Sequence, residues 1–291
     1  MIRWCMTILM IWTTATLAVD VQPLEIGEQA PDFSLMGVDS SMYSLQDFKK
    51  SDVLVIIFTA NHCPTAQAYE DRMIQLTDDY SRDKVAVVAI SSNYPSALRL
   101  DELAYSDLGD NFKEMQIRAE DKGYNFPYLY DGDTQETALA YGPQATPHVF
   151  IFDSDRKLRY QGRFDDTENP YVEPKQKDTR NAIQALLAGE PVPVKSTKVF
   201  GCSMKWKDKV DWVKQSNAEW KAKPVGVELI DSSKVAELAR NDSENLLLVN
   251  VWATWCGPCV VEFPELVKMY RIYSGRDFDM VTISADKPES T

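Results

Sequence analysis

The amino-acid sequence predicts an α/β fold in two modules, each with a central mixed sheet flanked by helices. Two apolar runs, VLVIIF (53–58) and VAVVAI (85–90), have the length of buried strands. Between them, Tyr69, Met73, Leu76 and Tyr80 recur at helical spacing. The order strand, turn, cysteine, helix returns near the C-terminal end, in NLLLVNVWA followed by WCGPC. Alternating strands and helices imply a largely parallel sheet.

The remaining elements of the first module are shorter and are separated by turn residues. They are a helix with Leu108, Phe112 and Met115 on one face, the strand FPYLY (126–130), a helix that Gly142 ends, and an antiparallel hairpin of HVFIFD (148–153) and LRYQGRFD (158–165). In the second module we expect a helix over Lys234–Arg240, a strand before WCGPC, a helix through Tyr270, and the strand DMVTISA.

These elements divide the chain into a first module over 24–165, a connector over 166–223 and a second module over 224–291. The connector holds eight lysines between Lys195 and Lys223, interleaved with tryptophans. Such a mixture can bind nucleic acid, but Trp206, Val210 and Val213 have helical spacing and favour packing. The whole chain carries a net charge of −13, which argues against nucleic acid as a partner.

Residues 1–20 have the pattern of a targeting segment. A positive start at Arg3 precedes an apolar stretch and small residues before a cleavage point. The stretch is short for a membrane span, so we expect a signal peptide, with an uncleaved N-terminal anchor as the alternative. Either one places the body of the protein outside the cytoplasm, secreted or periplasmic, and the anchor would be its only membrane contact.

The cysteines suggest thiol chemistry. Of the five, Cys5 lies in the targeting segment, which leaves Cys63, Cys202, Cys256 and Cys259. Four cysteines allow three pairings. If Cys256 and Cys259 form one disulfide, Cys63 and Cys202 are left as the default second pair.

The stretch WCGPC has the features of a dithiol exchange site. Cys256 stands where a strand meets a helix, and the helix N-terminus stabilises a thiolate there. Cys259 lies one turn further, so it can resolve a mixed disulfide on Cys256. Trp255 and Pro258 shape the turn. Half of a zinc site is the alternative, but neither a second CxxC nor a histidine follows.

WATWCGPC with the following Glu262-Phe263-Pro264 resembles the thioredoxin superfamily, in particular its extracytoplasmic thiol–disulfide reductases, which include cytochrome c maturation proteins. The resemblance implies that Glu262 assists proton transfer; a solvated helix glutamate is the alternative. That fold completes its site with a later cis-proline, and residues 224–291 cover only its β-α-β half. We therefore expect this module to be truncated, with an exposed sheet edge and marginal stability.

The first module resembles the redoxin family, relatives of the alkyl hydroperoxide reductase/thiol-specific antioxidant group, over about 24–205. The matching motifs are IGEQAPDFSL, FTANHCPTAQAYEDRM, FPYLYD, ATPHVFIFD, RYQGRFDD and GCSMKW. The resemblance places a cis-proline at Thr146-Pro147. Many members have a cysteine where this chain has Ala60, so exchange within that turn is impossible. Cys63 is left as a peroxidatic cysteine, as the partner of Cys202 in a redox pair or structural staple, or as an inert remnant.

His62 and His148 are the only histidines, and they flank Cys63 and Pro147 in the sequence. In a redoxin fold their loops face each other across the site. Three interpretations stay open: two surface-loop histidines, donors that stabilise the Cys63 thiolate, or a copper or zinc site with Cys63.

The sequence thus predicts an extracytoplasmic thiol–disulfide oxidoreductase with Cys256 as nucleophile and Cys259 as resolver, acting on protein disulfides or dithiols and needing no cofactor. The first alternative is a thiol peroxidase with an antioxidant role, in which Cys63 reacts with a hydroperoxide and WCGPC supplies the electrons. Further alternatives give the first module a metal-binding or a structural role.

Overall fold

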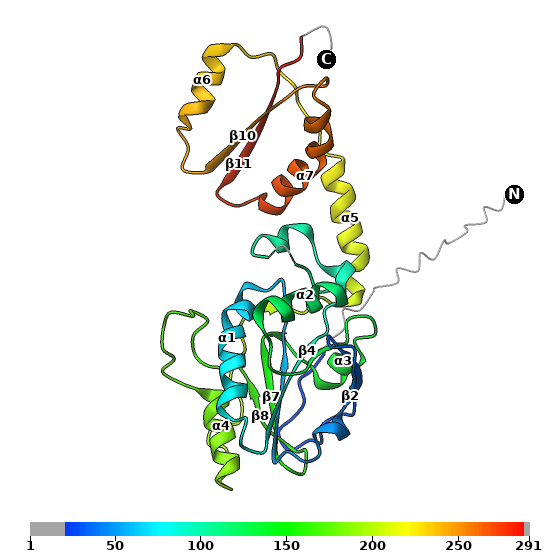
Figure 1. Ribbon diagram of the computed structural model, residues 1–291, viewed down its shortest axis with the longest axis vertical. Coiled ribbons are helices and arrows are strands. Elements are labelled where there is room, and N and C mark those ends of the chain that lie inside the picture. Colours follow the sequence, from blue (N-terminus) through cyan, green and yellow to red (C-terminus); the bar gives the residue numbers. More distant parts are fainter. Residues whose placement is uncertain (1–20, 107, 288–291) are drawn as a thin grey trace, which may run out of the picture.

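The computed structural model describes residues 21–106 and 108–287 and contains a seven-stranded mixed sheet in its first module (Figure 1). The strand order is β2-β1-β5-β4-β3-β7-β8. These strands are β1 (Ser34–Gly37), β2 (Met42–Ser44), β3 (Val53–Phe58), β4 (Val85–Ser91), β5 (Tyr128–Tyr130), β7 (His148–Phe152) and β8 (Leu158–Gly162).

The centre of this sheet is parallel and its sides are antiparallel. β4 pairs in parallel with β3 and with β5, whereas β7 runs antiparallel to β3 and β8 closes the sheet as a hairpin with β7. On the other side β1 and β2 form an antiparallel pair that joins β5. The predicted mixed sheet flanked by helices is confirmed; the sequence interpretation did not include β1 and β2.

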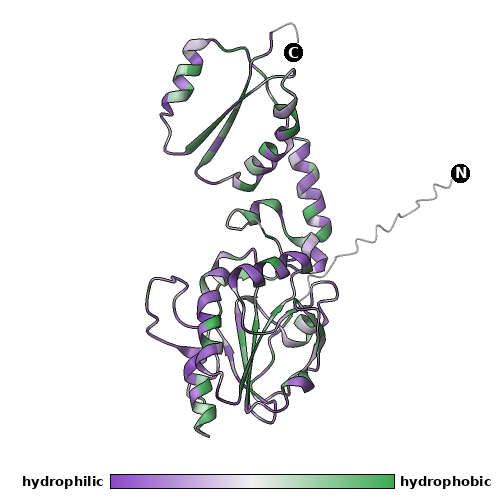
Figure 2. Ribbon diagram, in the orientation of Figure 1, coloured by the Kyte–Doolittle hydropathy of each residue, from purple (hydrophilic) through white to green (hydrophobic). Residues whose placement is uncertain are grey.

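The residues of β3 alternate between the two faces of the sheet, and both faces are covered. Val53, Val55 and Ile57 point to α1 (Pro64–Asp79), α2 (Phe112–Lys122) and α4 (Asp178–Leu187). Leu54, Ile56 and Phe58 face α3 (Glu136–Tyr141) and the segment that leads into β1. All six side chains are buried, each contributing about 1.5–3 kcal/mol of hydrophobic free energy. Figure 2 shows apolar residues along these central strands.

The start of α2 corrects the sequence interpretation. Leu108 was expected on the helix, but the helix begins at Phe112. Asn111 accepts a hydrogen bond from the backbone N–H of Glu114, and the Glu114 carboxylate accepts one from the backbone N–H of Asn111. This capping box fixes the first turn after Leu108.

Segment 166–223, expected as a connector, contains α4, the short strand β9 (Cys202–Ser203), η4 (Lys207–Lys209) and α5 (Val210–Lys221). The side chains of Ala182 and Ile183 on α4 lie in the core of the first module. β9 pairs antiparallel with β6 (Ala145–Thr146). α5 then leads to the second module (Figure 1).

The second module contains α6 (Ser232–Arg240), β10 (Leu246–Trp252), α7 (Gly257–Tyr273) and β11 (Phe278–Ser284). β10 and β11 form a two-stranded parallel sheet, and neither pairs with a further strand among the described residues. Leu246 and Val251 are 71% and 63% exposed. α7 packs against η3 (Leu100–Leu103) of the first module, where Arg276 donates a hydrogen bond to the hydroxyl of Tyr105.

No helix within 21–106 and 108–287 is both long and apolar enough to span a membrane. The targeting segment expected over 1–20 lies outside the described residues.

Candidate functional site

The turn between β10 and α7 holds Cys256 and Cys259 in a disulfide with a Cα–Cα distance of 5.3 Å. Cys256 is the N-cap of α7, with φ −85° and ψ 90°, and Pro258 occupies the first turn of the helix. Both cysteines are half-buried, whereas Trp255 beside them is 77% exposed. When the disulfide is reduced, the free backbone N–H groups at this helix end favour the thiolate.

Asp286 connects this turn to the end of β11 through hydrogen bonds. The sequence interpretation did not include this contact. The Asp286 carboxylate accepts hydrogen bonds from the Thr254 backbone N–H at 2.9 Å and the Thr254 hydroxyl at 2.9 Å. The Ser284 hydroxyl donates to it as well, at 2.7 Å. These bonds hold the pKa of Asp286 below its usual range, with the Ser284 bond as the largest cause. Asp286 thereby fixes the residues that lead into Cys256.

Glu262 lies on α7 and its side chain is exposed. Its role in proton transfer stays a prediction.

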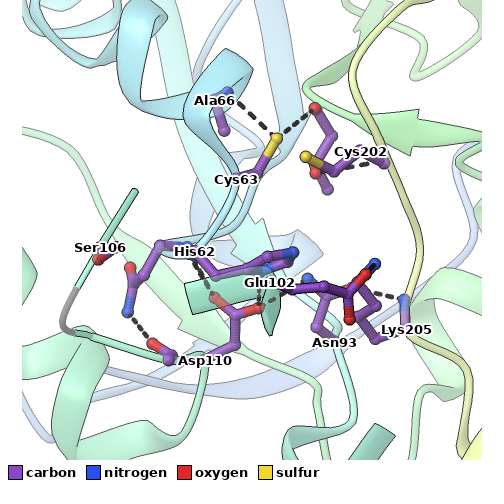
Figure 3. A network of polar contacts seen from close by, with 12 residues as sticks. His62, Cys63, Ala66, Asn93, Glu102, Ser106, Asp110, Cys202 and Lys205 are labelled. Atoms are coloured by element: carbon purple, nitrogen blue, oxygen red, sulfur yellow. Dashed lines mark hydrogen bonds and ion pairs between the residues drawn. The ribbon is translucent and has the colours of Figure 1, made fainter. Parts of the chain in front are cut away.

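The second cysteine site is in the first module, where Cys63 is the N-cap of α1. Cys63 has no exposed surface. Its sulfur lies 3.2 Å from the backbone oxygen of Thr146 and 3.4 Å from the backbone nitrogen of Ala66, which donates to it (Figure 3). Cys63 is thus the N-cap of α1, as Cys256 is the N-cap of α7.

Cys202 comes from β9 and lies beside Cys63. The pairing of β9 with β6 sets Cys202 opposite Thr146, and the peptide bond from Thr146 to Pro147 is cis, as the redoxin resemblance implied. Gly201 makes this approach feasible because it has φ +136°, and a Cβ there would lie 2.1 Å from the Thr146 oxygen. Cys63 and Cys202 are free thiols in this structure, so their disulfide stays a prediction.

The two cysteines differ in the pKa of their thiols. The hydrogen bond from the Cys202 thiol lowers the pKa of Cys63 to about 6, against the effect of burial, and Thr146 and the Ala66 N–H contribute further. The same bond raises the pKa of Cys202 well above its usual range. The reduced pair therefore holds its proton on Cys202 and its negative charge on Cys63.

Below the sulfurs lies a buried ion pair of His62 and Asp110 (Figure 3). The Nδ1 of His62 is 2.5 Å from Oδ2 of Asp110. Burial lowers the pKa of His62, but the charge of Asp110 and this hydrogen bond outweigh it, so the pKa is raised overall. The same partners hold the pKa of Asp110 low although the carboxyl is buried. The Nε2 of His62 is buried and has no hydrogen-bond partner among the described residues.

Asparagines complete the shell around Asp110. Its carboxylate accepts hydrogen bonds from the backbone N–H of Asn61 at 2.7 Å and from Nδ2 of Asn93 at 2.8 Å. The Oδ1 of Asn93 accepts the backbone N–H of Lys205, whose Nζ is 2.6 Å from the Glu102 carboxylate. This chain of contacts ties the GCSMKW stretch to the His62 site. Asp110 and Asn93 carried no spacing signal; only the GCSMKW motif pointed to Lys205.

The structure corrects the expectation that His148 faces Cys63 alongside His62. His148 lies on β7, where its Nδ1 accepts the Gln144 backbone N–H at 3.1 Å and its Nε2 is 2.9 Å from Oε1 of Gln161. Burial lowers its pKa to about 4, so the ring is neutral and structural. Within the described ranges, no three His, Cys, Asp or Glu side chains converge as a metal site. The metal-binding alternative therefore has no ligand set there.

Two α/β modules, each with a cysteine at the junction of a central strand and a helix, define a thiol protein of the thioredoxin superfamily. The AhpC/TSA family matches residues 26–161, and the thioredoxin family matches residues 229–291. The chain therefore belongs to this superfamily and joins an AhpC/TSA domain to a thioredoxin domain.

Curated relatives resemble parts of the chain. The thioredoxin-like protein YneN of Bacillus subtilis is 36% identical over 130 residues, which are 45% of this chain and 66% of that protein. The thiol-disulfide oxidoreductase ResA of Oceanobacillus iheyensis is 31% identical over 87 residues, which are 30% of this chain and 44% of that protein. The chain thus spans about two thirds of the first relative and less than half of the second.

Solved structures resemble a larger part of the chain. An uncharacterized conserved protein from Geobacillus kaustophilus is 39% identical with a TM-score of 0.56, and the match covers 66% of this chain and 98% of that one. A hypothetical protein from Sinorhizobium meliloti is 32% identical with the same TM-score, covering 64% of this chain and 97% of that one.

Proposed function

We propose that the chain is an extracytoplasmic thiol–disulfide oxidoreductase that works by dithiol/disulfide exchange at Cys256 and Cys259. The observation that carries the proposal is the disulfide itself: it joins the half-buried residues Cys256 and Cys259 at the start of α7, beside the exposed Trp255. The similarity to ResA, a thiol-disulfide oxidoreductase, supports this assignment. The extracytoplasmic location is inferred from the sequence pattern of residues 1–20.

The exchange proceeds in two displacements. In the reduced form the Cys256 thiolate attacks one sulfur of a partner disulfide, and the other partner sulfur leaves with the bonding electron pair. The Cys259 thiolate then attacks the Cys256 sulfur and releases the second partner sulfur. Two electrons and two protons pass to the partner, and the Cys256–Cys259 disulfide forms. The same steps in reverse oxidise a partner dithiol, so the partners are protein disulfides or dithiols.

Reduction of insulin disulfides by the full chain tests this function. In a chain that also carries Cys202→Ser, Cys256→Ser should abolish the activity, because the attacking sulfur is gone. Cys259→Ser should accumulate a mixed disulfide on Cys256, because the resolving sulfur is gone. Cys202→Ser is the matched control and should keep the activity. Full activity of Cys256→Ser refutes the assignment.

A second candidate is a thiol peroxidase in the first module, which the lowered pKa of Cys63 favours. The Cys63 thiolate would attack a hydroperoxide, taking one oxygen to become a sulfenic acid while an alcohol or water leaves. The Cys202 thiol would then displace water from that sulfur and form the disulfide, which the Cys256 dithiol would reduce. Cys63→Ser should abolish hydroperoxide consumption and leave insulin reduction intact. Absence of hydroperoxide consumption by the unaltered chain rules this candidate out.

A further inference from the structure

Cys63 and Cys202 touch each other but differ in access to solvent. Cys63 is completely buried, whereas Cys202 is half-buried. Cys202 lines a surface cavity of about 590 Å³, and Cys63 does not. The cavity is lined by Thr65, Asp166, Thr167, Glu168, Phe200, Gly201 and Cys202. A thiol that enters this cavity meets the sulfur of Cys202 first.

The fold holds Cys202 in place from both sides. Before it, Gly201 lies against the backbone of Thr146 at a distance that no other residue type fits. After it, Lys205 is fixed through its backbone to Asn93 and through its ammonium to Glu102. This anchoring brings together two sulfurs that are far apart in the sequence.

We propose that Cys63 and Cys202 form a second dithiol/disulfide centre, in which Cys202 is the sulfur that an external thiol attacks and Cys63 is the sulfur that leaves. This centre is separate from the exchange site at Cys256 and does not depend on it. The attacked sulfur, Cys202, is accessible in a cavity, and the leaving sulfur, Cys63, is buried at a helix N-terminus.

The surroundings of Cys63 favour its departure as a thiolate. A leaving sulfur departs faster when its thiolate is stable. The Ala66 N–H at the start of α1 donates to this sulfur. The charge of Asp110, the hydrogen bond to Asp110 and, to a smaller extent, the charge of Cys63 raise the pKa of the buried His62, although burial opposes this.

The reaction balances with a dithiol as the electron donor. A donor thiolate attacks Cys202, the Cys63–Cys202 bond breaks, and Cys63 leaves with the electron pair. The second donor thiolate then attacks the donor sulfur bound to Cys202, so a donor disulfide forms and Cys202 is released. Cys202 takes one proton, Cys63 stays a thiolate, and the other proton goes to solvent. A partner disulfide, which takes the two electrons back, regenerates the oxidised centre.

The cavity rim selects the donor by charge. Asp166 and Glu168 are the charged groups of the lining, and both are acidic. A thiol with basic or neutral surroundings should therefore approach faster than an anionic thiol, and added salt should reduce the difference. The donor class is a dithiol, in a protein or peptide, that carries no acidic groups beside its sulfurs.

The test uses the full chain with Cys5, Cys256 and Cys259 replaced by serine, so that failure of the exchange function does not affect it. The protein is oxidised with a small disulfide, treated with the cationic monothiol cysteamine, quenched in acid and mapped by peptide mass spectrometry. We expect a Cys63–Cys202 disulfide, and then cysteamine on Cys202 in about tenfold or greater excess over Cys63. Failure of the disulfide to form, or an adduct mainly on Cys63, overturns the proposal.

The charge of the rim is tested with the same protein and two monothiols, cysteamine and the anionic mercaptopropionate. Glu168→Gln should reduce the ratio of their rates by about two- to fivefold, because one acidic group is removed. Glu136→Gln, an exposed glutamate on α3 away from this cavity, is the matched control and should leave the ratio unchanged. An unchanged ratio in Glu168→Gln overturns the charge selection.

Discussion

His62, the residue before Cys63, forms a buried ion pair with Asp110, with 2.5 Å between Nδ1 and Oδ2 (Figure 3). Neither side chain has more than 2% of its surface exposed. Burial disfavours the charged form of each group, but their mutual attraction outweighs it: the pKa of His62 is raised and the pKa of Asp110 is lowered. The raised pKa of His62 favours its protonated form, which places a positive charge on the residue that precedes Cys63 in the chain.

Replacing Asp110 by Asn should uncouple this arrangement. His62 loses the carboxylate that holds its proton, so its pKa falls and the pKa of Cys63 rises. The free energy of unfolding should decrease by about 1–3 kcal/mol, because the amide of Asn cannot accept all the hydrogen bonds that the carboxylate accepts. Chemical denaturation and a thiolate titration measure the two effects. Asp133→Asn, on an exposed side chain that the Tyr130 hydroxyl contacts, is the control and should change neither. If Asp110→Asn lowers the free energy of unfolding but leaves the thiolate titration of Cys63 unchanged, the ion pair has only a structural role.

The ultraviolet thiolate absorbance of Cys63 should titrate near pH 6, whereas a free cysteine titrates near about 8.5. The folded pKa lies below the unfolded one, so the thiolate contributes fully to stability above about pH 8.5. That contribution is lost as the pH falls through about 6. The measurement uses the chain with Cys256 and Cys259 replaced by serine, and Cys63→Ser should remove the inflection. An inflection near that of a free cysteine would contradict the hydrogen bonding described for the pair.

Gly201→Ala should separate β9 from β6. The added Cβ would lie 2.1 Å from the Thr146 oxygen, and the backbone has a φ that alanine disfavours, so Cys202 must move away from Cys63. We expect formation of the Cys63–Cys202 disulfide to slow by about tenfold or more, because the two sulfurs are no longer held in contact. Gly189→Ala is the matched control: Gly189 has φ +72° and open space around it, so it reports the backbone effect alone. Equal effects of the two substitutions on disulfide formation would show that the close approach is unimportant.

The elements that could be predicted are those whose signal is local. The strands at 53–58 and 85–90 are continuous apolar runs, and the structure confirms both. The start of α2 was predicted too early because Leu108 fits the helical spacing, although the capping pair of Asn111 and Glu114 stood in the sequence. Strands of two or three residues, such as β6 and β9, have no periodic pattern and exist only through their partners.

The site was predictable to the extent that motifs name its residues. The cysteines and His62 stand in motifs, and the structure brings Cys63 and Cys202 together. Asn93 lies just after β4 and Asp110 lies just before α2, so the two are separated by a long connecting segment. Only the folded chain brings them together with His62. The position of His148 depends on the register of β7 against β3, where it lies opposite Phe58, and spacing in the sequence does not fix that register.

Amide hydrogen exchange should differ between β3 and β10, the two strands that precede the cysteine turns. β3 is paired on both sides and all its residues are buried, so its amides open only with the whole first module. β10 pairs with β11 alone among the described residues, and its side chains are exposed or half-buried. We expect the amides of β10 to exchange about a hundredfold faster than those of β3 in the same sample. Strong protection across 246–253, equal to that of 53–58, would contradict this expectation.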